Sequence, residues 1–250
     1  TSNPISEAIS SAVKIAGISS ANAALPESKS FLFETVVPGD NMAELRVAVE
    51  QQLDELIPIP PQETMFDIVK VGKEERGTRI AGVGFADRIV NDTLSVFDQA
   101  NIAVRSLEGE AFAMARSLLP KGDDSTTLVI DIGRTTTKIA IIAGRIPRFS
   151  TTIGIGGHAL TLAVQKHFGV TEAEARKVKA ERGIVPSAGN DDYLSAMLST
   201  VSAIRDEIGT RLEYWQSKAM QTKEHEPVSR GILIGGNASV RGLPEYLEGA

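Results

Sequence analysis

Cysteine is absent from this 250-residue sequence, and histidine occurs only three times. Disulfides, cysteine nucleophiles and thiolate zinc sites are therefore excluded, and the scattered His158, His167 and His225 do not indicate a metal cage. No apolar run approaches the roughly 20 residues that a membrane-spanning helix needs. Acidic residues outnumber basic ones, 32 to 26, giving a formal net charge of −6. Because no block of Lys or Arg is present, we expect no nucleic-acid binding.

The remaining composition is typical of a globular protein. Hydrophobic residues make up 42% of the chain, enough to bury a core. The opening residues TSNPISEA have neither the basic nor the apolar region of an export signal, so we expect a cytoplasmic protein. The chain starts without Met and stops at GLPEYLEGA, where a further helix is predicted to start, so we expect a stretch trimmed at both ends.

Helices and strands are predicted to alternate, which indicates an α/β protein. The expected helices cover 5–16, 42–56, 87–99 and 110–118, then a helix ending near Phe168, one capped by Thr171 and Glu174, and a long one through 194–215. The expected strands cover 31–37, 65–71, 79–85, 102–104, 127–131, 137–143, 146–153 and 231–234. Asn41 and Glu44 resemble a capping box, and the helix after them presents one apolar face: Met42, Leu45, Val49, Leu53, Leu56. The prolines of Ile57–Pro61 should end that helix.

The strongest chemical motif is the segment LVIDIGRTTTK, residues 128–138. An apolar strand ends on Asp131, a turn starts at Gly133, and hydroxyl residues lead into a second apolar strand. Such a tight hairpin points backbone N–H groups into one concavity, which suits phosphate oxygens, while a carboxylate at the strand end can hold the waters of Mg²⁺. The segment taken alone also fits an ordinary hairpin whose aspartate bonds its own turn.

A second glycine-containing motif, ILIGGNASVRGL, spans residues 232–243. A buried strand runs into Gly235 and Gly236 and then into small residues, which lets a flat ring or a phosphate approach the backbone closely. Alone it fits an ordinary strand-to-helix turn equally well. No GxxxxGK[ST] motif occurs, and Gly82-Val83-Gly84 lacks the third glycine of a dinucleotide site.

The order of these elements resembles the actin-like ATPase fold, a ribonuclease H-like, two-lobed α/β architecture. Three short strands, a glycine-rich loop, helices and then strand–Gly–Gly follow one another as in that superfamily. The resemblance implies a first lobe at 1–120, with an inserted strand–helix–strand–strand subdomain at about 31–86, and a second lobe at 121–250. Among its members, the type IV pilus assembly PilM family and the cell-division FtsA family carry such an insertion.

Three stretches are similar to the PilM family in particular. They are the subdomain entry at Ala24-Leu25-Pro26 with Ser28, the Ile57–Pro60 stretch followed by Glu63 and Asp67, and the LEGEAFAMAR segment at 107–116. The resemblance runs nearly end to end. Its order of motifs is specific, although each motif is loose.

The resemblance also implies roles for individual residues. Residues that match the phosphate and Mg²⁺ loop are Asp131, Gly133, Thr135, Thr136 and Thr137. Those that match the loop beside the ribose and phosphates are Gly156 and Gly157, and those of the adenosine motif are Gly235, Gly236, Asn237 and Ala238. Lys179 matches a lysine placed against the adenine, or is a solvated lysine among charged neighbours. Glu110 matches the residue that orients the attacking water, or is a first-turn acid favoured by the helix dipole.

Two departures from the family pattern bear on ATP binding. The family's first phosphate loop, an Asp-x-Gly hairpin near the N-terminus, is absent from these residues, so we expect weak or no ATP binding by this stretch alone. Arg134 and Thr135 also replace the paired glycines of FtsA. Any hydrolysis is expected to be slow and dependent on Mg²⁺.

The resemblance further implies an adapter of the pilus inner-membrane platform. Its expected partners are a cytoplasmic peptide of the membrane protein PilN, docked beside the inserted subdomain, and other platform proteins, with self-association as a further option. Contact with the inner membrane would then be indirect and peripheral. The alternatives are an efficient ATPase, an FtsA-like cell-division scaffold, and an actin-like protein of the type II secretion platform.

Overall fold

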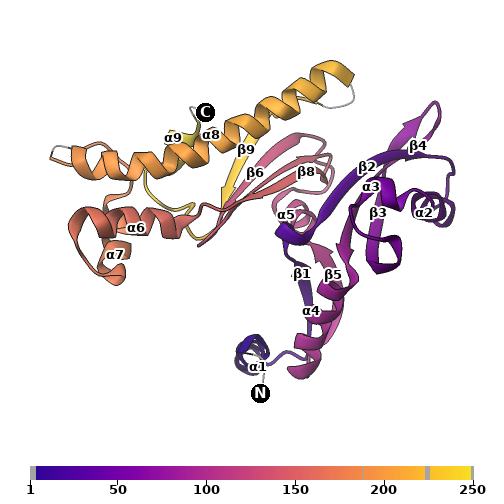
Figure 1. Ribbon diagram of the computed structural model, residues 1–250, viewed down its shortest axis with the longest axis horizontal. Coiled ribbons are helices and arrows are strands. Elements are labelled where there is room, and N and C mark those ends of the chain that lie inside the picture. Colours follow the sequence, from indigo (N-terminus) through magenta and orange to yellow (C-terminus); the bar gives the residue numbers. More distant parts are fainter. Residues whose placement is uncertain (1–3, 188, 223–225, 249–250) are drawn as a thin grey trace. The chain divides into compact units, whose positions relative to one another are not determined.

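Residues 4–187, 189–222 and 226–248 are described by the computed structural model (Figure 1). The chain divides into two units. The first comprises Thr1–Asp123 together with Arg145–Phe149, and the second comprises Asp124–Gly144 and Ser150–Ala250. No helix within the described ranges is long and apolar enough to cross a bilayer.

A parallel pair of strands, β1 and β5, forms one part of the first unit, with helices beside it. Its elements are α1 (Pro4–Ala16), β1 (Ser20–Leu25), the 3₁₀ helix η1 (Glu27–Lys29), α4 (Asp87–Gln99), β5 (Ala103–Gly109) and α5 (Glu110–Leu118). The pairing runs from Ser20 opposite Ala103 to Leu25 opposite Gly109. A small core of Leu25, Phe85 and Val90 lies under α4.

The second part of the first unit is a three-stranded antiparallel sheet in the order β2-β4-β3. Its elements are β2 (Phe31–Val37), α2 (Met42–Glu50), α3 (Leu53–Leu56), the 3₁₀ helix η2 (Pro61–Glu63), β3 (Thr64–Glu74) and β4 (Gly77–Ala86). The helices bury Leu45, Val49 and Leu53 against the sheet, as predicted, in one core with Phe33 and Ile80.

Gly82 and Gly84 of β4 form the GVG motif, which is not a dinucleotide site. A Cβ at Gly82 would lie 2.2 Å from the ring of Phe33, and one at Gly84 would lie 2.2 Å from Cδ1 of Ile57. Glycine is therefore needed at both positions, because the side chains of Phe33 and Ile57 fill the space that a Cβ would occupy.

Several predicted elements of the first unit differ in extent. The helix expected at 42–56 is two helices with Gln51 and Gln52 between them, and Met42 is exposed rather than buried. Asn41 does cap α2 by accepting from the N–H of Glu44, but the Glu44 carboxylate accepts from Asp40. β5 runs on to Gly109 and is much longer than the predicted strand at 102–104, so the LEGEAFAMAR segment begins as a strand and continues as α5. The strands β3 and β4 leave only residues 75–76 between them, fewer than the predicted strands at 65–71 and 79–85 do.

The second unit contains a four-stranded sheet in the order β8-β7-β6-β9, with helices that pack on one another. Its elements are β6 (Thr126–Ile132), β7 (Thr137–Ala143), the part of β8 (Ile146–Ile153) that follows Phe149, α6 (Gly157–Phe168), α7 (Glu172–Arg182), α8 (Asp191–Thr222), β9 (Arg230–Ile234) and α9 (Leu243–Glu248). β6 pairs antiparallel with β7 and parallel with β9. Figure 1 shows α6, α7 and the long α8 (orange) grouped beside one another.

The apolar periodicity predicted this helical layer well. Met197, Val201, Ile204 and Ile208 of α8 are buried. Trp215 is buried too, and its indole N–H donates to the carbonyl of Glu226 at 3.0 Å, so the ring packs inside the unit. The predicted capping box of Thr171 and Glu174 is present in full at the start of α7.

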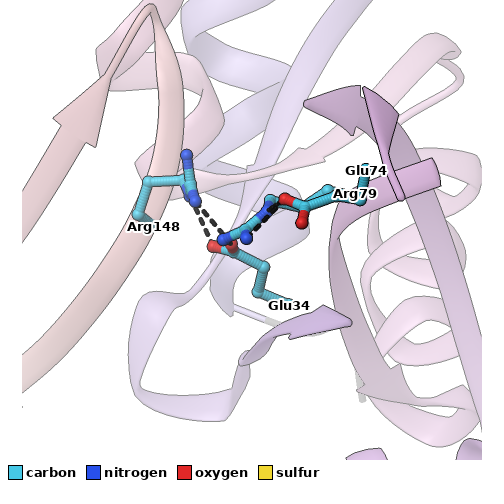
Figure 2. A network of polar contacts seen from close by, with 4 residues as sticks. All are labelled: Glu34, Glu74, Arg79 and Arg148. Atoms are coloured by element: carbon cyan, nitrogen blue, oxygen red, sulfur yellow. Dashed lines mark hydrogen bonds and ion pairs between the residues drawn. The ribbon is translucent and has the colours of Figure 1, made fainter. Parts of the chain in front are cut away.

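A buried ionic network ties together three strands and the segment Arg145–Phe149 within the first unit (Figure 2). Glu34 accepts hydrogen bonds from Arg79 at 2.9 Å and from Nε of Arg148 at 2.5 Å, and Arg79 also bonds Glu74. The side chains of Arg148 and Arg79 are 7% and 9% exposed. Burial of the Glu34 carboxylate raises its pKa, but the hydrogen bonds and charges of Arg148 and Arg79 lower it further, so the pKa lies below the ordinary value of 4.5.

We predict that Glu34→Gln costs about 3 kcal/mol of unfolding free energy at pH 7, because it leaves buried arginine charges without their partner. Since the folded pKa of Glu34 is depressed, its contribution is present above the unfolded pKa near 4.5 and is lost as pH falls through the folded pKa. Urea unfolding from pH 7 to pH 3 measures both effects.

Lys73→Gln is the matched control. Lys73 pairs with Asp40 at 2.9 Å, but both side chains are at least 75% exposed. Its loss should cost less than about 1 kcal/mol. Equal costs for the two variants would contradict the structural role of the network.

Candidate functional site

The turn between β6 and β7 has the form expected of an anion-binding loop. The N–H of Gly133 donates to the carbonyl of Thr136 at 2.9 Å and closes the turn. The next three backbone N–H groups, of Arg134, Thr135 and Thr136, have no hydrogen-bond acceptor among the residues that the structure describes. Consecutive N–H groups of this kind can meet phosphate oxygens.

The loop from Gly154 to Gly157 packs directly against this turn. The first two N–H groups of α6, those of Gly157 and His158, donate to the carbonyls of Gly133 and Arg134 at 2.9 and 2.7 Å. A Cβ at Gly156 would lie 2.7 Å from backbone atoms of Thr135 and Thr136, so only glycine permits this approach.

Thr137 serves this packing rather than the open side of the turn. Its side chain is fully buried, and its hydroxyl donates to the carbonyl of Ile155 at 2.7 Å. The Thr137 hydroxyl is therefore hydrogen-bonded inside the protein and does not face the open side of the turn. Thr135 and Thr136, by contrast, lie in the turn itself and are not buried.

The loop after β9 packs against the end of β6, where Asp131 and Ile132 lie. Gly235 has φ of +92°, and a Cβ there would lie 2.4 Å from Oδ1 of Asp131. The backbone N–H of Asn237 donates to the carbonyl of Ile132 at 3.3 Å. Gly236 and Ala238 lie in the same loop, and a Cβ at Gly236 would meet no atom within 4 Å.

Lys179 reaches this site from α7. Its ammonium donates to the carbonyl of Gly157 at 3.1 Å and to Oδ1 of Asn237 at 2.8 Å. Burial, with a smaller effect from Arg176, lowers the pKa of Lys179 below its ordinary value. The geometry therefore favours the prediction of a site lysine over that of a solvated one.

Asp131 has a neighbour that the sequence analysis overlooked. Nζ of Lys138 lies 3.6 Å from Oδ2 of Asp131, and the two residues are directly opposite in the β6–β7 ladder. The sequence alone would predict this pair if the register of the β6–β7 hairpin were known, because the register places Lys138 opposite Asp131. Among the described residues, no cluster of three His, Asp or Glu side chains forms a direct metal site, and His225 lies outside the described residues.

Glu110 belongs to the first unit, whereas all the other predicted site residues belong to the second. It is the first residue of α5, and its Oε2 accepts the backbone N–H of Glu27 at 2.7 Å. Glu27 in return accepts the N–H of Ala111 at 3.1 Å. This capping arrangement accounts for an acid at Glu110 without catalysis, and a water-orienting role stays a prediction.

The first unit also contains an apolar cavity of about 330 Å³. Its walls come from β1, β3, β4, β5, α4 and α5 and include Leu25, Met65, Val83, Phe85, Leu107 and Phe112. Two carboxylates, Asp67 and Glu108, also line it. β3 lies at the end of its sheet, so an elongated apolar ligand would meet both the cavity and a strand edge.

Comparison with known proteins identifies the family. The sequence model of the type IV pilus assembly protein PilM matches residues 1–250. The chain belongs to the PilM family. This membership confirms the resemblance predicted from the order of the motifs.

Solved structures confirm the actin-like fold. A PilM–PilN type IV pilus biogenesis complex superposes with a TM-score of 0.73 at 20% identity, covering 98% of this chain and 71% of that one. MreB5 of Spiroplasma citri bound to ADP superposes with a TM-score of 0.51 at 18% identity, covering 64% and 57%. The same protein bound to AMPPNP gives 0.52 at 18% identity, covering 64% and 56%.

The two adjacent glycines after β9 provide a test of the site's packing. We predict that Gly235→Ala destabilises the protein by roughly 1–3 kcal/mol, because it combines a left-handed backbone with a clash against Asp131. Gly236→Ala should change stability by less than about 0.5 kcal/mol, since that position has neither constraint. Urea denaturation of the pair measures the difference, and similar values would contradict the close contact with Asp131.

Proposed function

We propose that this PilM-family protein is an actin-like adapter of the type IV pilus assembly platform that binds a nucleotide and a membrane-protein peptide. The observation that carries the nucleotide half is the row of three backbone N–H groups in the β6–β7 turn that lack acceptors among the described residues. The family match favours this function over a cell-division scaffold or a type II secretion protein.

The residues of the second unit fit ATP with Mg²⁺. The turn at Arg134–Thr136 supplies donors for phosphate oxygens, and Lys179 supplies a positive charge beside Gly157. Glycines at 156, 157 and 235 let the loops pack closely around the β6–β7 turn, and Gly236 leaves open space beside the loop after β9. When bound, Mg²⁺ would neutralise phosphate charge, and Asp131 is the carboxylate suited to hold its waters. Structures of MreB5 with ADP and AMPPNP support nucleotide binding by this fold.

The cavity of the first unit suits an apolar peptide segment. We assign it to a cytoplasmic peptide of PilN, the protein found with PilM in the solved biogenesis complex. Mostly apolar walls would bind hydrophobic side chains, and the edge of β3 offers backbone hydrogen bonds to an extended chain. Contact with the inner membrane would follow from this partner, and the adapter itself would be cytoplasmic.

Nucleotide binding is tested by titrating fluorescent ATP, with Mg²⁺, into the protein. Because these 250 residues contain no counterpart of the family's first phosphate loop, the titration uses a chain that includes that loop. We predict saturable binding that Asp131→Ala weakens by at least about tenfold, since the carboxylate at the strand end is lost. Slow hydrolysis, measured by phosphate release, is expected at most.

Asp92→Ala, on the exposed side of α4, serves as the control and should leave the affinity unchanged. A folded protein that binds no nucleotide would remove the nucleotide half of the proposal. The chain would then act as a docking scaffold alone.

Peptide binding is tested with two exposed methionines of the first unit. Met65 is 43% exposed and lines the cavity, whereas Met42 is 45% exposed and does not. We predict that Met65→Glu weakens binding of a labelled PilN cytoplasmic peptide at least about tenfold, because it puts a charge beside the apolar walls. Met42→Glu should bind as the parent does. Fluorescence anisotropy measures both, and equal affinities would place the peptide elsewhere.

A further inference from the structure

The side chain of Asn237 contacts three separate segments of the second unit. Its Nδ2 donates to the carbonyls of Gly133 and Ile132 at 3.0 and 3.3 Å, and its Oδ1 accepts from Lys179 at 2.8 Å. One amide therefore joins the loop after β9, the β6–β7 turn and helix α7.

The chemistry of these neighbours fixes which way the amide points. An ammonium group can only donate, and a carbonyl oxygen can only accept. Rotating the amide by 180° would set its NH₂ against Lys179 and its oxygen against two carbonyls. All the contacts are satisfied in one orientation and lost in the other.

Gly157 leaves the space that this amide occupies. A Cβ added there would lie 2.0 Å from both Nδ2 and Oδ1 of Asn237. Gly157 also shares the carbonyl of Gly133 as acceptor, through its own N–H at 2.9 Å. The glycine and the asparagine therefore form one packing unit at the start of α6.

Lys179 keeps one donor for a ligand. Its ammonium has three N–H donors, of which two go to Gly157 and Asn237. No further partner for it exists among the residues that the structure describes. The two fixed hydrogen bonds orient the third donor.

We propose that Asn237 is a positioning residue that assembles the nucleotide site before any nucleotide arrives. It holds the carbonyls of the β6–β7 turn inward, so that the turn presents its free N–H groups, and it directs the remaining donor of Lys179 toward an acceptor atom of the nucleotide. This inference rests on the proposed function for the identity of the ligand, but the assembly itself exists without ligand. Pre-organisation of this kind raises affinity because less ordering is required on binding.

The first test is made on nucleotide-free protein by hydrogen exchange. The probes are the amides of Gly133, Gly157 and His158, which are hydrogen-bonded within the assembly. We expect Asn237→Ala to speed their exchange at least about tenfold. Without the hydrogen bonds of the Asn237 side chain, local opening of this region costs less free energy. Asn237→Asp should do the same, since a carboxylate cannot donate to the two carbonyls. Asn91→Ala, on exposed α4, is the matched control and should change nothing.

A second measurement separates positioning from a general structural effect. Asn237→Asp keeps an acceptor for Lys179 and adds a negative charge, so NMR titration of the lysine side chain should show its pKa rise. Asn237→Ala should leave the pKa of Lys179 without this rise. Both variants should weaken ATP binding about tenfold or more, while amide exchange in α4 stays as in the parent.

The outcomes are distinguishable. Unchanged exchange at Gly133, Gly157 and His158 in Asn237→Ala would overturn the inference, even if nucleotide affinity fell, because Asn237 would then be only a ligand contact. Fast exchange in a protein that binds no nucleotide would support the assembly and overturn the proposed ligand. Exchange that rises throughout the second unit would also overturn the inference, since it would show global destabilisation.

Discussion

The candidate site depends on two backbone hydrogen bonds, from the N–H groups of Gly157 and His158 to the carbonyls of Gly133 and Arg134. The first N–H groups of a helix ordinarily lack partners and often bind anions. Here the carbonyls of the β6–β7 turn accept hydrogen bonds from the first two N–H groups of α6, so these two groups are not available to bind an anion. The turn's carbonyls at Gly133 and Arg134 therefore face α6, and the groups that we propose as anion donors are the turn's own N–H groups at Arg134–Thr136. The glycines at 156 and 235 follow from the same close packing of backbone on backbone.

In the first unit, a buried network of ion pairs contributes to stability. Glu34, Glu74, Arg79 and Arg148 form a network of two acids and two bases in which both arginines are almost fully buried. Removing one of these residues would leave a buried charge without a partner. The loss of folding stability would come from that uncompensated charge. The network holds the segment Arg145–Phe149 to strands β2 and β4 by polar contacts. The apolar cavity of the same unit, which we assign to a peptide, is lined by none of these four residues.

Local patterns in the sequence predicted most of the fold, and non-local pairing explains most of what they missed. Helices α4 and α5 and strands β2, β7 and β8 have the predicted bounds, because periodicity and turn residues mark their ends. β1 was not predicted, since its small residues SANAAL carry no strand pattern and its partner β5 lies about 80 residues on. The site residues were named through family resemblance. Their contacts, such as the hydrogen bond of Thr137 to Ile155 and the ion pair of Asp131 with Lys138, depend on register and burial that no motif contains.

Amide resonances of ¹⁵N-labelled protein test the central claim most directly. We propose the backbone N–H groups of Arg134, Thr135 and Thr136 as the anion donors of the site. In a chain that includes the family's first phosphate loop, ATP with Mg²⁺ should therefore shift these three resonances strongly and saturably. The resonances of Gly157 and His158, already hydrogen-bonded, should move little. Shifts confined to other segments, or none at saturating nucleotide, would contradict the account.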